Sequence, residues 1–79
     1  MKIFREIKSY INEDTYRINV INNKINIINY IEIKSFSDNK IIIKHKEGYT
    51  TITGKELIIS KMYENEILIT GTIKALELR

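Results

Sequence analysis

Isoleucine is the residue that most restricts the folds open to this chain. It occupies 19 of the 79 positions, whereas alanine occurs once. A β-branched side chain loses rotamer freedom in a helix but packs well on the pleated surface of a sheet. The residue usage therefore favours strands, and the pattern along the chain decides where those strands lie.

From Thr15 onward, apolar and polar residues alternate in short segments separated by turn residues. Strict alternation is typical of a half-buried strand, and turn signals every 8 to 12 residues or so are typical of a small all-β domain. Strands are predicted at 15–21, 24–36, 40–46, 49–53, 57–62 and 67–78. The segment 24–36 is long enough to bend or to form two strands. We predict turns at Asn22-Asn23 and at residues 37–39. The expected fold is mainly β: a single small antiparallel sheet, roll or barrel-like domain of about six or seven short strands.

One tripeptide occurs twice, as Ile52-Thr53-Gly54 and as Ile69-Thr70-Gly71. Glycine adopts positive φ easily and permits another backbone to approach closely. We therefore predict structural roles: Gly54 in a turn between two strands, Gly71 at a bend or close approach, and Gly48 in the turn after residue 47. The apolar parity also changes after Gly71, which predicts a bulge or bend near Lys74-Ala75.

Residues 2–12 show a different periodicity, that of an amphipathic helix. The apolar stripe consists of Ile3, Phe4, Ile7, Tyr10 and Ile11. Lys2, Arg5 and Lys8 outnumber Glu6 on the opposite face. Two interpretations stay open, since the stripe can pack on the sheet or dock on a partner protein or a membrane surface. We expect one domain spanning 1–79, with an N-terminal helix at 1–13 and a β domain at 15–79.

The charged residues identify no obvious partner. The net charge is +3, with both signs mixed along the chain. No apolar run reaches the roughly 18 residues that a membrane-spanning helix needs, and the charged N-terminus does not resemble a secretory signal. We expect a cytoplasmic protein with no transmembrane segment of its own.

Few side chains are suited to catalysis. His45 is the only histidine and there is no cysteine, so a zinc site lacks its usual ligands. Glu64 and Glu66 flank a loop residue, where solvated charge is the common outcome. Gly54 and Gly71 match no phosphate-binding loop pattern. We therefore expect no catalytic residue, no metal and no cofactor, and we expect His45 to border the core or close a strand face.

Nucleic-acid binding is the main rival among binding functions, because small β-barrels bind single strands through aromatic side chains and a basic groove. The seven aromatic residues here are spread one per predicted element, so packing is their simpler role. A small barrel that binds single-stranded nucleic acid or another ligand remains the alternative hypothesis.

The order of motifs over about three-quarters of the chain resembles the YabP/YqfC family of small endospore-formation proteins, the YqfC branch most closely. The matching features, in chain order, are Asn29-Tyr30, the apolar Ile31, Ile33 and Phe36, the strand Ile41 to Lys44, Gly48, the I-x-G-x-x-L of Ile52, Gly54 and Leu57, the strand end at Met62, the segment Glu66 to Ile69, the G-x-I of Gly71 and Ile73, and the terminal Leu76 to Leu78. The chain departs from the family in having no proline, and in carrying Ile28 and Ile31 where many members have Glu and Gly.

The resemblance implies a sporulation protein of the mother cell, needed for the spore cortex and coat. It would work beside a co-encoded membrane protein, peripheral to the outer forespore membrane. The family brings no catalytic residues with it, in agreement with the search above. The function expected from the sequence is therefore docking or self-assembly, with a protein partner or with further copies of the chain.

Overall fold

The computed structural model describes residues 15–79 of the chain. The predicted helix at 1–13 and its stripe (Ile3, Phe4, Ile7, Tyr10 and Ile11) lie outside the described residues. Within 15–79 the structure is entirely β, which confirms the predicted class.

Six antiparallel strands form one open sheet. They are β1 (Arg17–Ile21), β2 (Lys24–Ile28), β3 (Glu32–Phe36), β4 (Lys40–His45), β5 (Gly48–Met62) and β6 (Glu66–Leu78). Their order across the sheet is β1-β2-β6-β5-β4-β3. The predicted turns occur between β1 and β2, where Asn22 has a φ of 53°, and between β3 and β4. The long segment 24–36 forms two strands that are separated at residues 29–31.

One prediction about the strands is wrong. We expected a turn at Gly54 to end one strand and a second strand to begin at Leu57, but β5 runs unbroken from Gly48 to Met62. The polar Lys55-Glu56 pair marks a register shift in the β5–β6 pairing, where β5 carries an extra residue opposite Gly71. An extra residue of this kind bends a strand without ending it.

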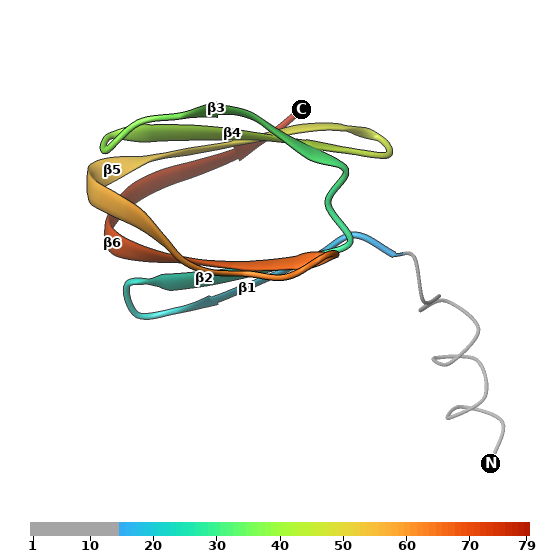
Figure 1. The fold of residues 1–79 in the computed structure, drawn as a ribbon. Helices are drawn as coiled ribbons and strands as arrows, with labels where there is room; N and C mark the ends of the chain where they lie inside the picture. The colour runs from blue at the N-terminus through green and yellow to red at the C-terminus, as the bar shows by residue number, and fades with distance from the viewer. Residues whose placement is uncertain (1–14) are drawn as a thin grey trace, which may run out of the picture.

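The predicted bulge near Lys74-Ala75 is confirmed. Thr53 pairs with Ala75 and Gly54 pairs with Ile73, which leaves Lys74 as an unpaired extra residue in β6. Both long strands are therefore irregular at the same level, and the β5–β6 hairpin bends there, as Figure 1 shows at the left of the molecule.

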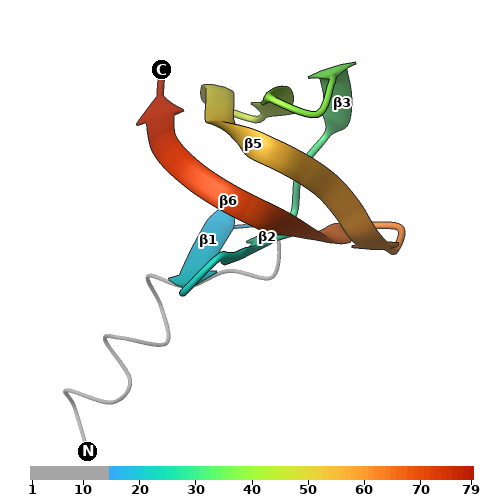
Figure 2. The same ribbon diagram turned by 90° about the vertical axis from the view of Figure 1, so that its left-hand side faces the viewer.

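The bend divides the sheet into two layers. Residues 48–53 of β5 pair with β4 and continue the sheet to β3, whereas residues 66–70 of β6 pair with β2 and continue it to β1. Figures 1 and 2 show the β3–β4 hairpin on one side of the bent β5–β6 hairpin and the β1–β2 hairpin on the other. Each long strand thus belongs to both layers.

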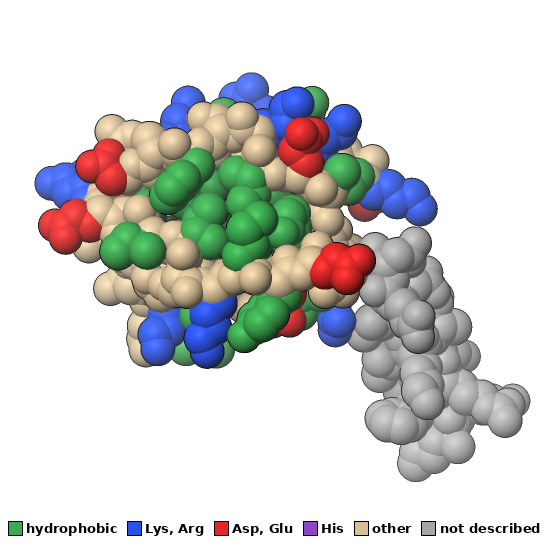
Figure 3. Space-filling model, viewed as in Figure 1, with side chains coloured by type: hydrophobic (Ala, Val, Ile, Leu, Met, Phe, Trp, Pro, Cys, Tyr) green, Lys and Arg blue, Asp and Glu red, His purple; other side chains and the backbone are tan. Residues whose placement is uncertain are grey.

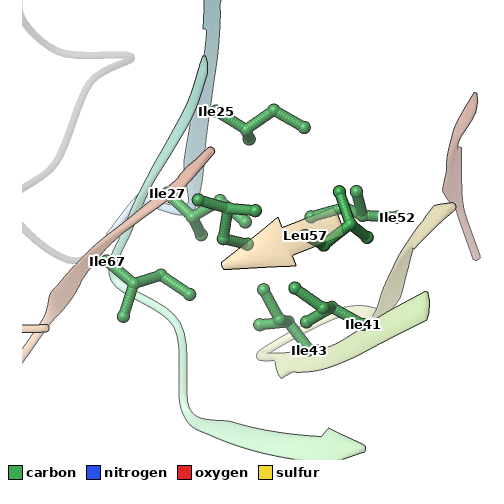
Figure 4. Packing of buried hydrophobic residues seen from close by; sticks show 8 residues of the cluster. Ile25, Ile27, Ile41, Ile43, Ile52, Leu57 and Ile67 are labelled. Carbon is green, nitrogen blue, oxygen red and sulfur yellow. The ribbon is translucent and has the colours of Figure 1, made fainter. Parts of the chain in front are cut away.

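The core lies between the layers and consists almost wholly of isoleucine. Its buried apolar members are Ile25, Ile27, Ile41, Ile43, Ile52, Leu57, Ile67 and Ile69. In Figure 4 the side chains from β2 and β6 point toward those from β4 and β5. Alternation along each strand places these residues on the inner face, which explains why the sequence pattern located them.

Candidate functional site

Among residues 15–79, strand pairing joins the two layers only through the bent hairpin, so each layer keeps two edges in this part of the chain. Because β4 pairs with β5 over residues 48–53 alone, no described strand pairs with that side of residues 58–62. In the same way β2 pairs with β6 over residues 66–70, and no strand within 15–79 pairs with that side of residues 74–78. Two open boundaries between the layers result, and we call them seams. Both ribbon views place β3 and residues 58–62 along one seam, and β1 and residues 74–78 along the other.

The β3–β5 seam, as we name the first, carries apolar side chains that face inward yet remain exposed. Phe36 pairs with the core residue Ile41, and Met62 pairs with the core residue Ile67, so the register directs both toward the inner face. Their exposed fractions are nevertheless 55% for Phe36 and 61% for Met62. Figure 3 shows an apolar patch between the two layers on this side of the molecule. The opposite layer is too narrow to cover the edge of this inner face.

The β1–β6 seam repeats the same arrangement on the other side. Val20 pairs with the core residue Ile25, and Leu78 pairs with the buried Thr50. Val20 and Leu78 are 54% and 59% exposed, and Ile18, Ile73 and Leu76 pack against the core beside them. The fold therefore presents two apolar strips that the described residues leave uncovered.

The two copies of the repeated tripeptide lie next to the bend, one in each layer. Ile52 pairs with Ile41 of one short hairpin, and Ile69 pairs with Ile25 of the other. The glycine that follows each isoleucine lies where the long strands approach each other most closely. A Cβ at Gly54 would collide with the Thr72 carbonyl oxygen, and one at Gly71 would lie 2.6 Å from the Glu56 carbonyl oxygen.

Gly71 also has a φ of 133°, which L-residues rarely adopt. Gly48 begins β5, and a Cβ there would collide with the carbonyl oxygen of the terminal Arg79. None of the three glycines contributes to a phosphate-binding loop in this arrangement, because the atoms that crowd them are backbone carbonyl oxygens.

His45 ends β4 on the inner face and is 8% exposed. Its ring stacks on that of Tyr16, with centroids 4.0 Å apart and planes 8° from parallel. Neither ring nitrogen has a hydrogen-bond partner among residues 15–79. The Tyr16 hydroxyl donates a hydrogen bond to Thr50 Oγ1 at 2.7 Å. Burial raises the pKa of the Tyr16 phenol above its ordinary value, so the phenol stays neutral. The pair closes one end of the core, because it links the start of β1 to β4 and β5.

We predict that His45→Phe stabilises the protein. Phenylalanine keeps a ring for Tyr16 to stack on and removes two buried nitrogens that lack partners, a gain of about 1 kcal/mol in the free energy of unfolding. Thermal unfolding measures the effect, and a domain of this size should gain roughly 4–8 °C per kcal/mol. As the control, Thr50→Val is expected to have the opposite sign, because it removes the acceptor for the Tyr16 hydroxyl. A loss of stability in His45→Phe would show that the imidazole has a bonding role.

The charged residues form no reactive cluster among the described residues. No group of three His, Cys, Asp or Glu side chains lies close enough to hold a metal ion within 15–79. Glu66 accepts a hydrogen bond from Asn26 Nδ2 at 2.8 Å, whereas Glu64 is exposed in the turn between β5 and β6. The Glu66 carboxylate is therefore engaged in a hydrogen bond within the sheet, whereas the Glu64 carboxylate is exposed.

Cationic side chains gather at one place. Lys40, Lys55 and Lys74 line a shallow depression of about 380 Å³ over Thr53 and Gly54, on the outer face at the bend. A depression of this kind attracts anions through long-range charge. The side chains that line it are all exposed, so it offers no buried polar side chain for a specific ligand. The backbone amide of Gly54 is also engaged, because it donates to the carbonyl oxygen of Asn39.

The strongest features of the molecule are therefore its two apolar seams, which suit the binding of another chain. Sequence reasoning anticipated docking through the helix stripe, but it did not identify the seams. Phe36 and Met62 reach the inner face only because a register shift precedes each of them, between Ile33 and Ser35 in β3 and between Ile59 and Lys61 in β5. Strict alternation along the sequence therefore neither places these two residues on the inner face nor reveals which inner positions the opposite layer leaves uncovered.

Comparison with known proteins agrees with the family resemblance that the order of motifs indicates. Residues 15–79 include no helix that is long and apolar enough to cross a membrane. No curated protein matches the chain. The model of the YabP family matches residues 12–79, a span that includes all six strands, both seams and both copies of the repeated tripeptide. The chain therefore belongs to the YabP family.

Proposed function

We propose that this protein is a non-enzymatic docking component of spore formation. Membership of the YabP family supports a role in sporulation, and the motif order favours the YqfC branch within it. The proposed place of action is the mother-cell side of the outer forespore membrane. There it supports the formation of cortex and coat beside a membrane protein encoded next to it.

The β3–β5 seam is the observation that carries the proposal. Phe36 and Met62 lie on the inner face, yet both side chains are more than half exposed. This exposure favours the binding of a partner that buries them. Residues 58–62 add backbone groups that no described strand pairs with on that side, and such groups can bind an extended segment of a partner. The partner that fits this apolar seam is an apolar helix or strand of the membrane protein, or a second copy of this chain.

Phe36→Glu tests the proposal. A charge placed on the inner face at the seam should weaken binding to the co-encoded membrane protein by at least about tenfold, because the carboxylate must be desolvated when the partner docks. The measurement is the affinity of the full chain for the partner's soluble region, with the mass in solution recorded to detect self-association.

Ile21→Glu is the matched control. Ile21 is 67% exposed and pairs with Lys24 on the outer face of β1, away from the β3–β5 seam. We expect this variant to bind as the unchanged chain does. Equal losses in the two variants would place the interface elsewhere, and full binding by Phe36→Glu would refute the docking proposal.

The depression lined by Lys40, Lys55 and Lys74 favours a second candidate, an anionic ligand such as single-stranded nucleic acid. Tyr49 is the aromatic residue of β5 on the same outer face, and Tyr16 and Tyr30 pack against the core instead. The described residues therefore lack a row of aromatic side chains for base stacking. Filter binding against salt tests this candidate, since phosphate contacts give a steep decrease of affinity with salt concentration.

A further inference from the structure

One face of the molecule combines exposed isoleucines with cations that form no ion pair within residues 15–79. We call it the β2 face: the outer face of the layer that contains β1, β2 and the adjoining halves of β6 and β5. The register across these four strands aligns one row of outward-facing side chains: Ile21, Lys24, Thr70 and Ile58. The next row consists of Asn19, Asn26, Leu68 and Lys61. The core residues Ile25 and Ile69 lie between these rows and point inward, so both rows face away from the core.

The isoleucines at the two ends of the first row are exposed. Their exposed fractions are 67% for Ile21 and 57% for Ile58, and three strand spacings, about 14 Å, separate them. Between them Leu68 is only partly buried, and it lines a shallow depression of about 250 Å³ together with Ile21 and Lys24. Single exposed apolar side chains are ordinary on a protein surface, but these share one face of the sheet. The β2 face therefore offers apolar contacts across the whole width of its layer.

The same face carries three exposed cations: Arg17, Lys24 and Lys61. None of them takes part in an ion pair within residues 15–79. The acidic residue of these strand segments is Glu66, which is partly buried and accepts a hydrogen bond from Asn26 Nδ2 at 2.8 Å. The outer face of the other layer differs, because Glu32 lies opposite Lys44 there. The β2 face therefore has an excess of positive charge, and Figure 3 shows cationic and apolar side chains together along the lower side of the molecule.

We propose that the β2 face binds the surface of a bilayer that contains anionic phospholipids. Ile21 and Ile58 enter the boundary between headgroups and acyl chains, and the three cations lie against the lipid phosphates. A surface that combines apolar side chains with cations binds such a bilayer through burial and charge together. The face suits nucleic acid less well, because neither row contains an aromatic side chain on which a base could stack.

Lipid binding of this kind deepens the docking proposal, and it rests on the proposed function only for the location at a membrane. Phe36 and Met62 point toward the inner face, whereas the β2 face is the outer face of its layer. A chain held on lipid by the β2 face therefore keeps the β3–β5 seam open to a membrane-protein partner.

Vesicle binding by two matched variants tests the proposal. Ile21→Glu and Phe36→Glu each put a carboxylate in place of an apolar side chain that is more than half exposed, so they change the net charge equally. The full chain is titrated with vesicles of phosphatidylglycerol and phosphatidylcholine in equal parts, and the bound fraction is measured by cosedimentation. We expect Ile21→Glu to lower the affinity at least about tenfold, because a carboxylate replaces an inserted apolar side chain next to anionic headgroups. Phe36→Glu should stay within about threefold of the unchanged chain, since its charge lies away from the lipid.

A second pair of variants separates this face from the effect of net charge. The first variant combines Arg17→Gln, Lys24→Gln and Lys61→Gln. The second combines Lys40→Gln, Lys55→Gln and Lys74→Gln, at the depression over the bend. One cation next to an anionic bilayer changes binding about fivefold, so the first variant should lose about 100-fold in affinity and the second less than about fivefold. Circular dichroism confirms that each variant retains its β structure.

The proposal is overturned if the unchanged chain binds these vesicles no better than vesicles of phosphatidylcholine alone. Equal losses in the two triple variants, or in the two glutamate variants, would also overturn it. Tighter binding to a single-stranded oligonucleotide than to vesicles, lost in the first triple variant, would assign the face to nucleic acid instead. Partner binding is measured without lipid, so Ile21→Glu should lose vesicles but keep the partner, and Phe36→Glu should do the reverse. A failure of one proposal is therefore distinguishable from a failure of the other.

Discussion

Replacing Gly54 with alanine is expected to bring the β domain close to unfolding at room temperature. Gly54 is buried inside β5, and an added methyl group would collide with the carbonyl oxygen of Thr72 in β6. Neither backbone can retreat, because the amide of Gly54 donates to Asn39 and the two long strands are paired on both sides of this position. The expected loss is more than about 4 kcal/mol in the free energy of unfolding, a large share of the stability of a small domain.

Chemical denaturation of the purified variant measures this loss, with Gly48→Ala as the control. A methyl group at Gly48 would collide with the carbonyl oxygen of Arg79, and these two residues lie where β5 begins and just after β6 ends. The ends of two paired strands can move aside more cheaply than their middle. We therefore expect Gly48→Ala to cost no more than about 2 kcal/mol. If Gly54→Ala proved as stable as Gly48→Ala, the close approach of the long strands at the bend would be refuted.

The second large effect is expected in the core. Ile43→Ala should lower the free energy of unfolding by about 3–4 kcal/mol, because Ile43 is fully buried and its truncation leaves a cavity between the layers. The neighbouring Ile42→Ala should cost less than about 1.5 kcal/mol, since Ile42 lies on the outer face and pairs with Thr51. Urea titration of both variants gives the comparison. Similar losses at the two positions would contradict the assignment of inner and outer faces.

Local sequence features predicted most of the individual elements. The alternation around Ile25, Ile27, Ile41 and Ile43 identified both the strands and the face that each one buries. Asn tolerates the left-handed region, and Asn22 therefore marked a real turn. The change of parity after Gly71 located the bulge at Lys74. In each case the signal and its consequence lie within a few residues of each other.

The errors arose where the outcome depends on a distant strand. Gly54 with Lys55-Glu56 resembles a turn locally, yet β6 remains paired on both sides of it, so the strand bends and continues. The seams show the same dependence for the candidate site. Strict alternation from Ile33 would place Phe36 on the outer face. The register shift against β4 turns it inward, and the width of the opposite layer leaves it exposed.

The position of β6 has a consequence for how the protein is made. This strand is the last of the six to be synthesised, yet in the sheet it lies between β2 and β5 and supplies Ile67 and Ile69 to the core. Until residues 66–78 have been synthesised, β1 and β2 form only an isolated hairpin, which is marginally stable in water. The isoleucine-rich strands of the nascent chain must therefore stay apart until β6 has left the ribosome, and the sheet then closes around that strand.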